Sequence, residues 1–252
     1  MDSRPKAVFF DVGWTLVHPR ESLWDLFAAL AREVGAPMDA RQAEELVHSL
    51  MTANRDNAVA EFESGASYSD SDAEFALLFT TMARAIFTIA GFPGDHDALA
   101  MRFMERFWTR DNWTVYPEVV EAITELRGHG VRVGILSNAG SDLLDFLGIL
   151  DLLRHVDFTV VSAIEGMKKP DSRIFARALE RAGVAPEHAI HVGDMYLEDI
   201  LGARRVGVRP LLMERGALSM FPNHPESAKH SPPSFDVVRD VHEVLKAAGL
   251  AR

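Results

Sequence analysis

Short apolar runs that end in a polar residue, each followed by a helical pattern, constrain the fold of this chain most strongly. They predict strands at 132–137, 158–162, 189–193 and 209–213. Helices are expected between and beside them, at 118–127, 141–147, 172–182 and 199–205. Strands that alternate with helices indicate parallel βαβ units. The sequence therefore predicts an α/β fold with a Rossmann-like, doubly wound parallel sheet.

The first strand is separated from the others by a long helical segment. KAVFFD, Lys6 to Asp11, has the pattern of a buried parallel strand. Apolar residues at helical spacing begin at Leu23, Phe75 and Leu99, and the stretch from Glu63 to Asp72 has the composition of a loop. We expect a discontinuous core at 1–18 and 114–252, with an inserted all-helical domain at 19–113. A Pro, Ser and His-rich loop is expected at 219–234, and a strand followed by a helix at 235–250.

Charge and composition exclude several classes of protein. Acidic residues outnumber basic ones by 37 to 26, which gives a net charge of -11. Binding to nucleic acid or to an anionic membrane is not expected, because it needs clustered basic residues. The absence of cysteine excludes disulfides and thiolate chemistry. No signal peptide or membrane-spanning run is recognisable, so we expect a cytoplasmic protein, either a monomer or a homodimer.

Polar side chains stand where the predicted strands end, and this is where open α/β sheets bind their ligands. They are Asp11, Ser137, Asn138, Asp194 and Asp199, with Lys168 and Lys169 in a nearby loop. Carboxylates that converge on one crevice need a cation between them, and Mg²⁺ binds carboxylates, water and phosphate oxygens. An aspartate can also attack phosphorus as a nucleophile. The pattern indicates metal-assisted phosphoryl transfer.

Four motifs resemble those of the haloacid dehalogenase superfamily, in that family's order and spacing. They are FFDVGWTL (Phe9 to Leu16), LSNA (Leu136 to Ala139), GMKKPDSRIF (Gly166 to Phe175) and HVGDMYLEDILGARRVG (His191 to Gly207). Together they span almost the whole chain outside the insertion. The position of the insertion is similar to that of the family's helical cap of the first type, which closes over the crevice and supplies specificity.

The resemblance implies a role for each matching position. Asp11 is expected to be the nucleophile that forms an aspartyl intermediate, and Lys169 to contact the substrate phosphate. Thr15, Ser137 and Asn138 are expected at the phosphate or in its supporting loop. Mg²⁺ is the implied cofactor, and its expected ligands are Asp11, the carbonyl of Gly13, Asp194 and Asp199. The implied activity is that of a phosphatase acting on a small phosphorylated metabolite.

The first motif departs from the family's D-x-D-x-T pattern, because Gly13 stands where the phosphatases have a second Asp. Losing a general acid and base typically costs about 10²–10⁴-fold in rate. His18, Glu21 or Asp111 could replace it, or the substrate could be one with a good leaving group, such as an acyl phosphate.

Other branches of the superfamily also lack this Asp. A phosphonatase would need a lysine in the cap, and the insertion has none; a cation pump would need membrane helices. A 2-haloacid dehalogenase remains an alternative, although Asp194 and Asp199 argue against metal-free chemistry. A catalytically weak protein that binds a phosphometabolite remains another. An interaction module that uses the cap surface is a third, and no sequence feature favours it.

Overall fold

The structure is a computed structural model and describes residues 4–216 and 235–250, so the loop expected at 219–234 lies outside the described residues. The chain forms two compact units. The first comprises Met1–His18, Ala66–Ser71 and Val115–Arg252, and the second comprises Pro19–Gly65 and Asp72–Thr114. The short segment Ala66–Ser71 thus belongs to the first unit, although it connects two helices of the second.

The first unit is built on a six-stranded parallel sheet with the strand order β5-β4-β1-β6-β7-β8. The strands are β1 (Ala7–Phe10), β4 (Arg132–Ser137), β5 (Phe158–Val161), β6 (Ala189–Gly193), β7 (Arg209–Met213) and β8 (Asp236–Val238). β1 lies at the centre, with Phe10 paired to Ile135 of β4 on one side and to Val192 of β6 on the other. All four residues of β1 are buried, as a strand covered on both faces requires.

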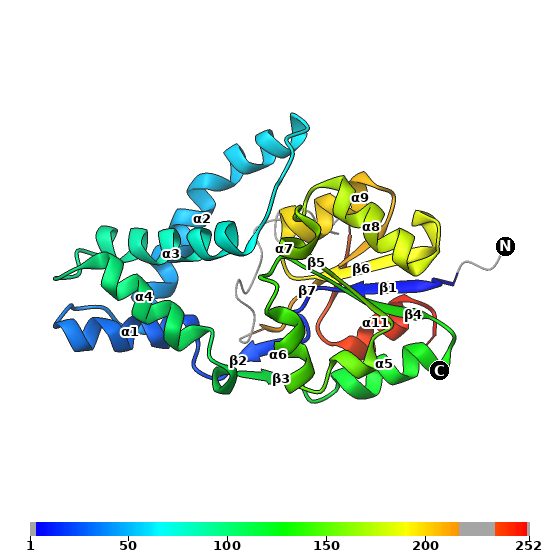
Figure 1. The fold of residues 1–252 in the computed structure, drawn as a ribbon, viewed down its shortest axis with the longest axis horizontal. Helices are drawn as coiled ribbons and strands as arrows, with labels where there is room; N and C mark the ends of the chain where they lie inside the picture. The colour runs from blue at the N-terminus through cyan, green and yellow to red at the C-terminus, as the bar shows by residue number, and fades with distance from the viewer. Residues whose placement is uncertain (1–3, 217–234, 251–252) are drawn as a thin grey trace. The chain divides into compact units, whose positions relative to one another are not determined.

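Helices cover both faces of this sheet, so the predicted α/β fold is confirmed. In Figure 1, α8 and α9 lie on one face, and α5 and α11 lie on the other. The helices of this unit are α5 (Val119–Gly128), α6 (Leu143–Ile149), α7 (Ser162–Glu165), α8 (Ser172–Ala182), α9 (Gly202–Arg205) and α11 (Val241–Ala247). Short 3₁₀ turns lie at Leu153–His155 and Pro186–His188, and a π-helical turn, η4, spans Tyr196–Leu201.

The helix α8 illustrates how sequence sets these elements. Asp171 caps its first turn by accepting a hydrogen bond from the backbone N–H of Arg173, and Gly183 ends it in the left-handed conformation at φ 65°. Its buried residues Ile174, Phe175 and Ala178 share one face and pack against the sheet. This packing fixes the start of the helix beside the loop that carries Lys169.

The strand order reverses at β1. The chain runs outward from β1 to β4 and β5, and then returns to place β6 on the other side of β1. In a doubly wound sheet, the carboxyl ends of the strands on either side of such a point diverge and leave a crevice for a ligand. Asp11, Ser137 and Asp194 directly follow or end the three central strands.

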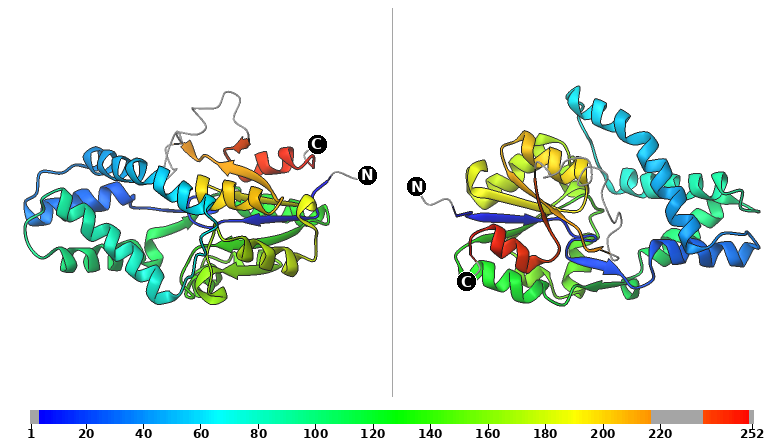
Figure 2. Two further views of the ribbon diagram at one scale, coloured as in Figure 1. Left: turned by 90° about the horizontal axis from the view of Figure 1, so that it is seen from above. Right: turned by 180° about the vertical axis from the view of Figure 1, so that it is seen from behind.

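The second unit is helical. Its helices are α1 (Leu23–Val34), α2 (Ala40–Glu63), α3 (Asp72–Ile89) and α4 (His96–Phe107), followed by a 3₁₀ turn at Arg110–Asn112. Figure 2 shows these helices from two further sides. Aromatic rings form much of the core: Phe27 stacks on Phe103 with ring centroids 4.6 Å apart, and Phe103 stacks on Phe107 at 5.5 Å. The sequence stripes predict α1, α3 and α4, but not α2 as a helix of its own.

Two short strands, β2 (Val17–Pro19) and β3 (Trp113–Val115), pair in a separate two-stranded sheet. The boundary between the two units falls within each of these strands. Among the described helices, none combines the length and the apolar character that crossing a bilayer requires.

Candidate active site

A buried ion pair joins Asp11 to Lys169 at the carboxyl ends of the central strands. Lys169 Nζ donates a hydrogen bond to Asp11 Oδ1 at 2.8 Å, and the two side chains are 2% and 12% exposed. Asp11 is held at the end of β1 because its backbone N–H donates to the carbonyl of Val192 at 2.8 Å. Burial raises the pKa of Asp11, against the opposing effects of Lys169 and of a hydrogen bond from Ser137. The pair therefore places a carboxylate that can act as a nucleophile directly beside a cation.

The backbone of Lys169 is clamped by Asn138. The Asn138 amide Nδ2 donates to the Lys169 carbonyl at 2.9 Å, and the Lys169 N–H donates to Asn138 Oδ1 at 2.8 Å. Both ends of the Asn138 side chain are thus used in holding the loop. Asn138 therefore supports the loop of Lys169, and its place at the phosphate stays a prediction.

Asp199 anchors the other side of the same lysine. Its Oδ1 accepts from Lys169 Nζ at 2.6 Å and from His191 Nε2 at 2.8 Å, while its Oδ2 accepts from the Met195 N–H at 2.9 Å. Burial acts to raise the pKa of Asp199, but Lys169 and His191 outweigh it and hold this pKa below its usual range. Asp199 lies in the π-helical turn η4, an irregularity that often marks a functional site.

Lys169 is therefore a charged group between two carboxylates. Burial alone would lower the pKa of Lys169, but the charges of Asp11 and Asp199 outweigh it and hold the pKa above its usual value. A lysine of this kind cannot act as a base near neutral pH. It can neutralise an anion that approaches Asp11.

Acidic groups outnumber the cation in this cluster. Asp194 follows β6 and is 9% exposed; burial and the charges of Asp11 and Asp199 raise its pKa well above its usual range. Burial and the charge of Asp199 also raise the pKa of the half-buried Glu198 to about 7. Lys169 compensates only part of this negative charge. The cluster therefore has the electrostatic character of a cation site.

The loop that follows Asp11 carries Gly13 and Thr15. A Cβ built on Gly13 would meet no atom within 4 Å. Thr15 is fully buried, and its Oγ1 has no hydrogen-bond partner among the described residues. Its carbonyl accepts a hydrogen bond from Arg215, which also pairs with Glu118 at 2.6 Å. Arg215, which follows β7, therefore holds this loop through a hydrogen bond.

The comparison with protein families agrees with this geometry. The family model described as haloacid dehalogenase-like hydrolase matches residues 5–207, which include every residue of the cluster. The chain belongs to this family of hydrolases. The four motifs predicted from the sequence all lie within the matched range.

Individual relatives in the family include named phosphatases. The chain is 29% identical over 210 residues to haloacid dehalogenase-like hydrolase domain-containing protein 3 of Danio rerio, covering 82% of this chain and 84% of that protein. It is 26% identical over 253 residues to a glyceraldehyde 3-phosphate phosphatase of Methanothermobacter thermautotrophicus, covering 95% and 99%. The crystal structure of a dehalogenase with an intermediate complex has the same fold, with a TM-score of 0.68, 22% identity and 98% coverage of both chains.

Three residues in or beside the cluster are not predicted from the sequence as site residues. His191 and Arg215 donate to the cluster or its loop, and Glu198 adds a carboxyl group beside it. The sequence contains a signal for the first only, because a histidine interrupts an otherwise apolar strand. Arg215 depends on contacts with residues far apart in the chain, and Glu198 depends on its burial beside Asp199.

The residues suggested to replace the missing acid lie in different places. The ring of His18 packs against Tyr116, with centroids 4.6 Å apart. Glu21 belongs to the second unit and pairs with Arg106 at 3.2 Å. Asp111 lies in the 3₁₀ turn of that unit.

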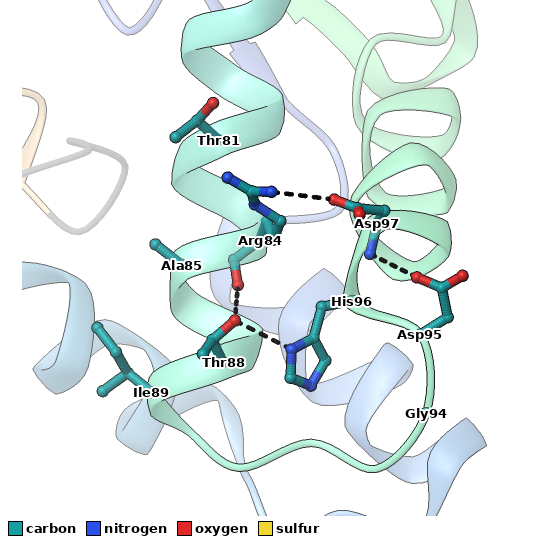
Figure 3. Close-up of a pocket in the computed structure, with 9 residues that line it drawn as sticks. All are labelled: Thr81, Arg84, Ala85, Thr88, Ile89, Gly94, Asp95, His96 and Asp97. Atoms are coloured by element: carbon teal, nitrogen blue, oxygen red, sulfur yellow. Dashed lines mark hydrogen bonds and ion pairs between the residues drawn. The ribbon is translucent and has the colours of Figure 1, made fainter.

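The second unit also has a pocket of about 670 Å³, between α3 and the start of α4. Figure 3 shows two contacts between its polar side chains: Arg84 pairs with Asp97 at 3.5 Å, and Thr88 contacts His96 at 3.0 Å. Asp95 occupies the helix N-terminus by accepting from two backbone N–H groups. None of the site residues predicted from the sequence lines this pocket.

Proposed function

We propose that the chain is a Mg²⁺-dependent phosphatase that acts on a small phosphorylated metabolite through an aspartyl-phosphate on Asp11. The observation that carries this proposal is the buried contact of 2.8 Å between Lys169 Nζ and Asp11 Oδ1. It places a permanent cation beside the oxygen that would attack phosphorus, at the end of the central strand. This pairing suits the transfer of an anionic group.

The residues present fit a magnesium ion. Asp11 and Asp194 are buried carboxylates in a cluster whose negative charge exceeds that of Lys169. Among the described residues, no group of three or more acidic or histidine side chains is placed to hold a metal ion. Mg²⁺ commonly binds one or two carboxylates together with water and substrate phosphate. We assign Asp11, Asp194 and the carbonyl of Gly13 as its ligands. Asp199 would act indirectly, by holding Lys169. Bound Mg²⁺ would polarise the phosphoryl group.

The proposed reaction has two steps. A carboxylate oxygen of Asp11 forms a bond to phosphorus while the bond from phosphorus to the ester oxygen breaks. Water then attacks the phosphorus of the aspartyl-phosphate, which releases inorganic phosphate and restores Asp11. Lys169 stays protonated in both steps and neutralises the phosphate oxygens.

Gly13 determines what kind of substrate suits this site. Because no acid stands at that position, the leaving group receives its proton from solvent or from another residue. Esters with weakly basic leaving groups, such as aryl or acyl phosphates, need the least assistance. We therefore propose a substrate with a good leaving group, with His18 as a candidate replacement acid. The helical unit stands in the sequence position of the family's cap, and we propose that it supplies specificity.

The test is hydrolysis of p-nitrophenyl phosphate with and without Mg²⁺, by the wild type, Asp11→Asn and Gly13→Asp. We expect Mg²⁺-dependent turnover that Asp11→Asn abolishes. Gly13→Asp should increase turnover of an alkyl phosphate by about 10-fold or more, because the side chain has free space and would restore the acid.

Two results would contradict the proposal. Turnover of 2-haloacids without metal would identify a dehalogenase. Failure to hydrolyse aryl, alkyl and acyl phosphates, with the protein folded, would indicate a binding protein.

A further inference from the structure

A histidine occupies the interior of β6, where packing alone would favour an apolar residue. His191 is fully buried, and its ring meets the ring of Phe175 edge to face, with centroids 5.4 Å apart. One nitrogen, Nε2, lies 2.8 Å from Asp199 Oδ1, while the other, Nδ1, has no hydrogen-bond partner among the described residues. Burying a polar ring with one nitrogen unsatisfied costs free energy. The hydrogen bond to Asp199 is therefore the contact that accounts for a histidine at this position.

The direction of the hydrogen bond follows from the state of Asp199. Lys169 Nζ donates to its Oδ1 at 2.6 Å and the Met195 N–H donates to its Oδ2 at 2.9 Å, so both oxygens of the carboxylate are acceptors. His191 must then carry a proton on Nε2 and donate it. In this tautomer Nδ1 is an acceptor, and no described residue donates a hydrogen bond to it.

Two further contacts hold the other side of the Asp199 carboxylate. Its Oδ2 accepts from the Met195 N–H at 2.9 Å, and its carboxylate lies directly over Gly193, where a Cβ would come within 2.2 Å of Asp199 Cγ. The carboxylate is thus held from the strand below, from the turn and from the ring of His191. Lys169 Nζ then lies 2.6 Å from Asp199 Oδ1 and 2.8 Å from Asp11 Oδ1.

We propose that His191 is a positioning residue for the reaction. By donating from Nε2 to Asp199, it fixes the carboxylate that holds the ammonium group of Lys169 beside Asp11. Without this donor, Asp199 Oδ1 keeps only Lys169 as a partner and can turn toward it, which draws the ammonium group away from Asp11. The inference rests on the proposed function for its effect on rate, but not for its effect on the geometry of Lys169.

Three substitutions separate the hydrogen bond from the volume of the ring. Glutamine can carry an amide donor to the position of Nε2, whereas methionine has similar length and no donor. Asparagine is polar, but its amide is one methylene short. We expect His191→Gln to retain the wild-type kcat within about 3-fold, and His191→Met and His191→Asn to lose about 10- to 100-fold, as outer-sphere partners typically do.

A matched control accounts for lost stability. Ile190→Ala removes a buried side chain from the same strand without touching Asp199, so it should lower Tm but leave kcat at 25 °C unchanged. Equal loss of kcat in His191→Gln and His191→Met would overturn the inference, as would wild-type kcat in His191→Met. If His191→Met does not fold, the comparison of the glutamine and asparagine variants decides in the same way.

Two measurements remain informative if no substrate is found. Calorimetry with inorganic phosphate and Mg²⁺ should give weaker binding by a similar factor in His191→Met, but not in His191→Gln. A crystal structure of His191→Met should place Lys169 Nζ beyond hydrogen-bond distance of Asp11. If the wild type neither hydrolyses phosphate esters nor binds phosphate, the proposed function fails. An unmoved Lys169 in that crystal structure would overturn the role of His191 independently.

Discussion

At the scale of single residues, the site depends on the balance between one buried cation and several carboxylates. A lysine that is 2% exposed keeps its charge only because Asp11 and Asp199 contact it directly. Asp194 makes no ion pair with that lysine among the described residues, and its pKa is raised well above the usual range. The three aspartates of the cluster therefore differ in their electrostatic surroundings.

The raised pKa of Asp194 gives a prediction for the metal-free protein. A carboxyl group whose pKa is higher in the folded state favours folding less as the pH rises above about 3.9, the ordinary pKa of an aspartate. In EDTA, Asp194→Asn should therefore have a higher Tm than the wild type at pH 8, and the difference should shrink toward pH 4.

Addition of Mg²⁺ should reverse this order. At a concentration of about 100 times Kd, the ion should raise the Tm of the wild type by roughly 5 °C or more, and that of Asp194→Asn much less. Thermal unfolding followed by circular dichroism measures both effects. An equal response of the two proteins to Mg²⁺ would contradict the assignment of Asp194 as a ligand.

Gly193 gives a second prediction at this scale. A Cβ at this position would lie 2.2 Å from Asp199 Cγ, so Gly193→Ala must displace the carboxylate that holds Lys169. We expect a loss of about 1–3 kcal/mol in the free energy of unfolding, together with a loss of turnover of 10-fold or more. Urea unfolding and steady-state kinetics measure the two quantities.

A second glycine is the matched control. Gly148 lies in α6, where an added Cβ meets nothing within 4 Å, so Gly148→Ala should stabilise the protein by about 0.4–1 kcal/mol and leave turnover unchanged. Normal activity in Gly193→Ala would mean that Asp199 can move without disturbing Lys169.

At the scale of elements, the sequence predicts what depends on local periodicity. The bounds of β4, β6, β7 and α8 agree with those expected, because each is an apolar run or stripe between clear end signals. The sequence does not predict the helix α2, because among the residues of α2 whose exposure is described only Ala43, Val47 and Phe62 are buried, and no apolar stripe stands out. The expected helix at 199–205 begins instead as the π-helical turn η4. Within it, Asp199 accepts from the Met195 N–H and from residues distant in the chain, contacts that local periodicity does not reveal.

The loop that carries Lys169 contacts a distant segment of the first unit. Asp171 Oδ2 accepts from the N–H of Tyr68 at 3.1 Å, and the Lys168 N–H donates to the Tyr68 carbonyl at 3.1 Å. Asp171 also caps α8 through Arg173. The composition of residues 63–72 predicts a loop around residue 68, but not its contact with the loop of Lys169, because the two segments are about a hundred residues apart.

Asp171 gives a prediction about pH. Burial acts to raise the pKa of Asp171, but hydrogen bonds from Arg173 and Tyr68 outweigh it and hold the pKa below its usual range. This stabilisation is present above about pH 3.9 and is lost as the pH falls toward the lower folded-state pKa. Asp171→Ala should lose about 1–2 kcal/mol of unfolding free energy at pH 7, and this difference should shrink below pH 4.

Asp171→Asn is the control for the charge, since it keeps an oxygen for the helix cap. Its loss at pH 7 should be smaller than that of Asp171→Ala. Urea unfolding at pH 7, 5 and 3 provides the comparison. If the difference in unfolding free energy between the wild type and Asp171→Ala did not change with pH, the helix cap would not depend on the charge of Asp171.

At the scale of the whole molecule, the site draws on one compact unit. Every cluster residue lies in the unit that contains the sheet, whereas Glu21 and Asp111 lie in the helical unit. The alternation of strands and helices makes this sheet predictable, and the three central strands β1, β4 and β6 end in or just before a residue of the site. The assignment of Ala66–Ser71 to the first unit was not predictable, because it rests on backbone contacts with residues near Lys169 rather than on composition.

This division predicts where ligand binding changes stability. A ligand stabilises the cooperative unit that binds it, and hydrogen exchange resolves such units along the chain. Mg²⁺ with inorganic phosphate should therefore slow exchange in β1, β4 and β6, and leave α1 and α4 nearly unchanged. Mass spectrometry of peptides from each unit measures this, and Asp194→Asn should lose the protection. Equal protection of α1 and α4 would mean that the two units unfold together, so that binding in one is coupled to the stability of the other.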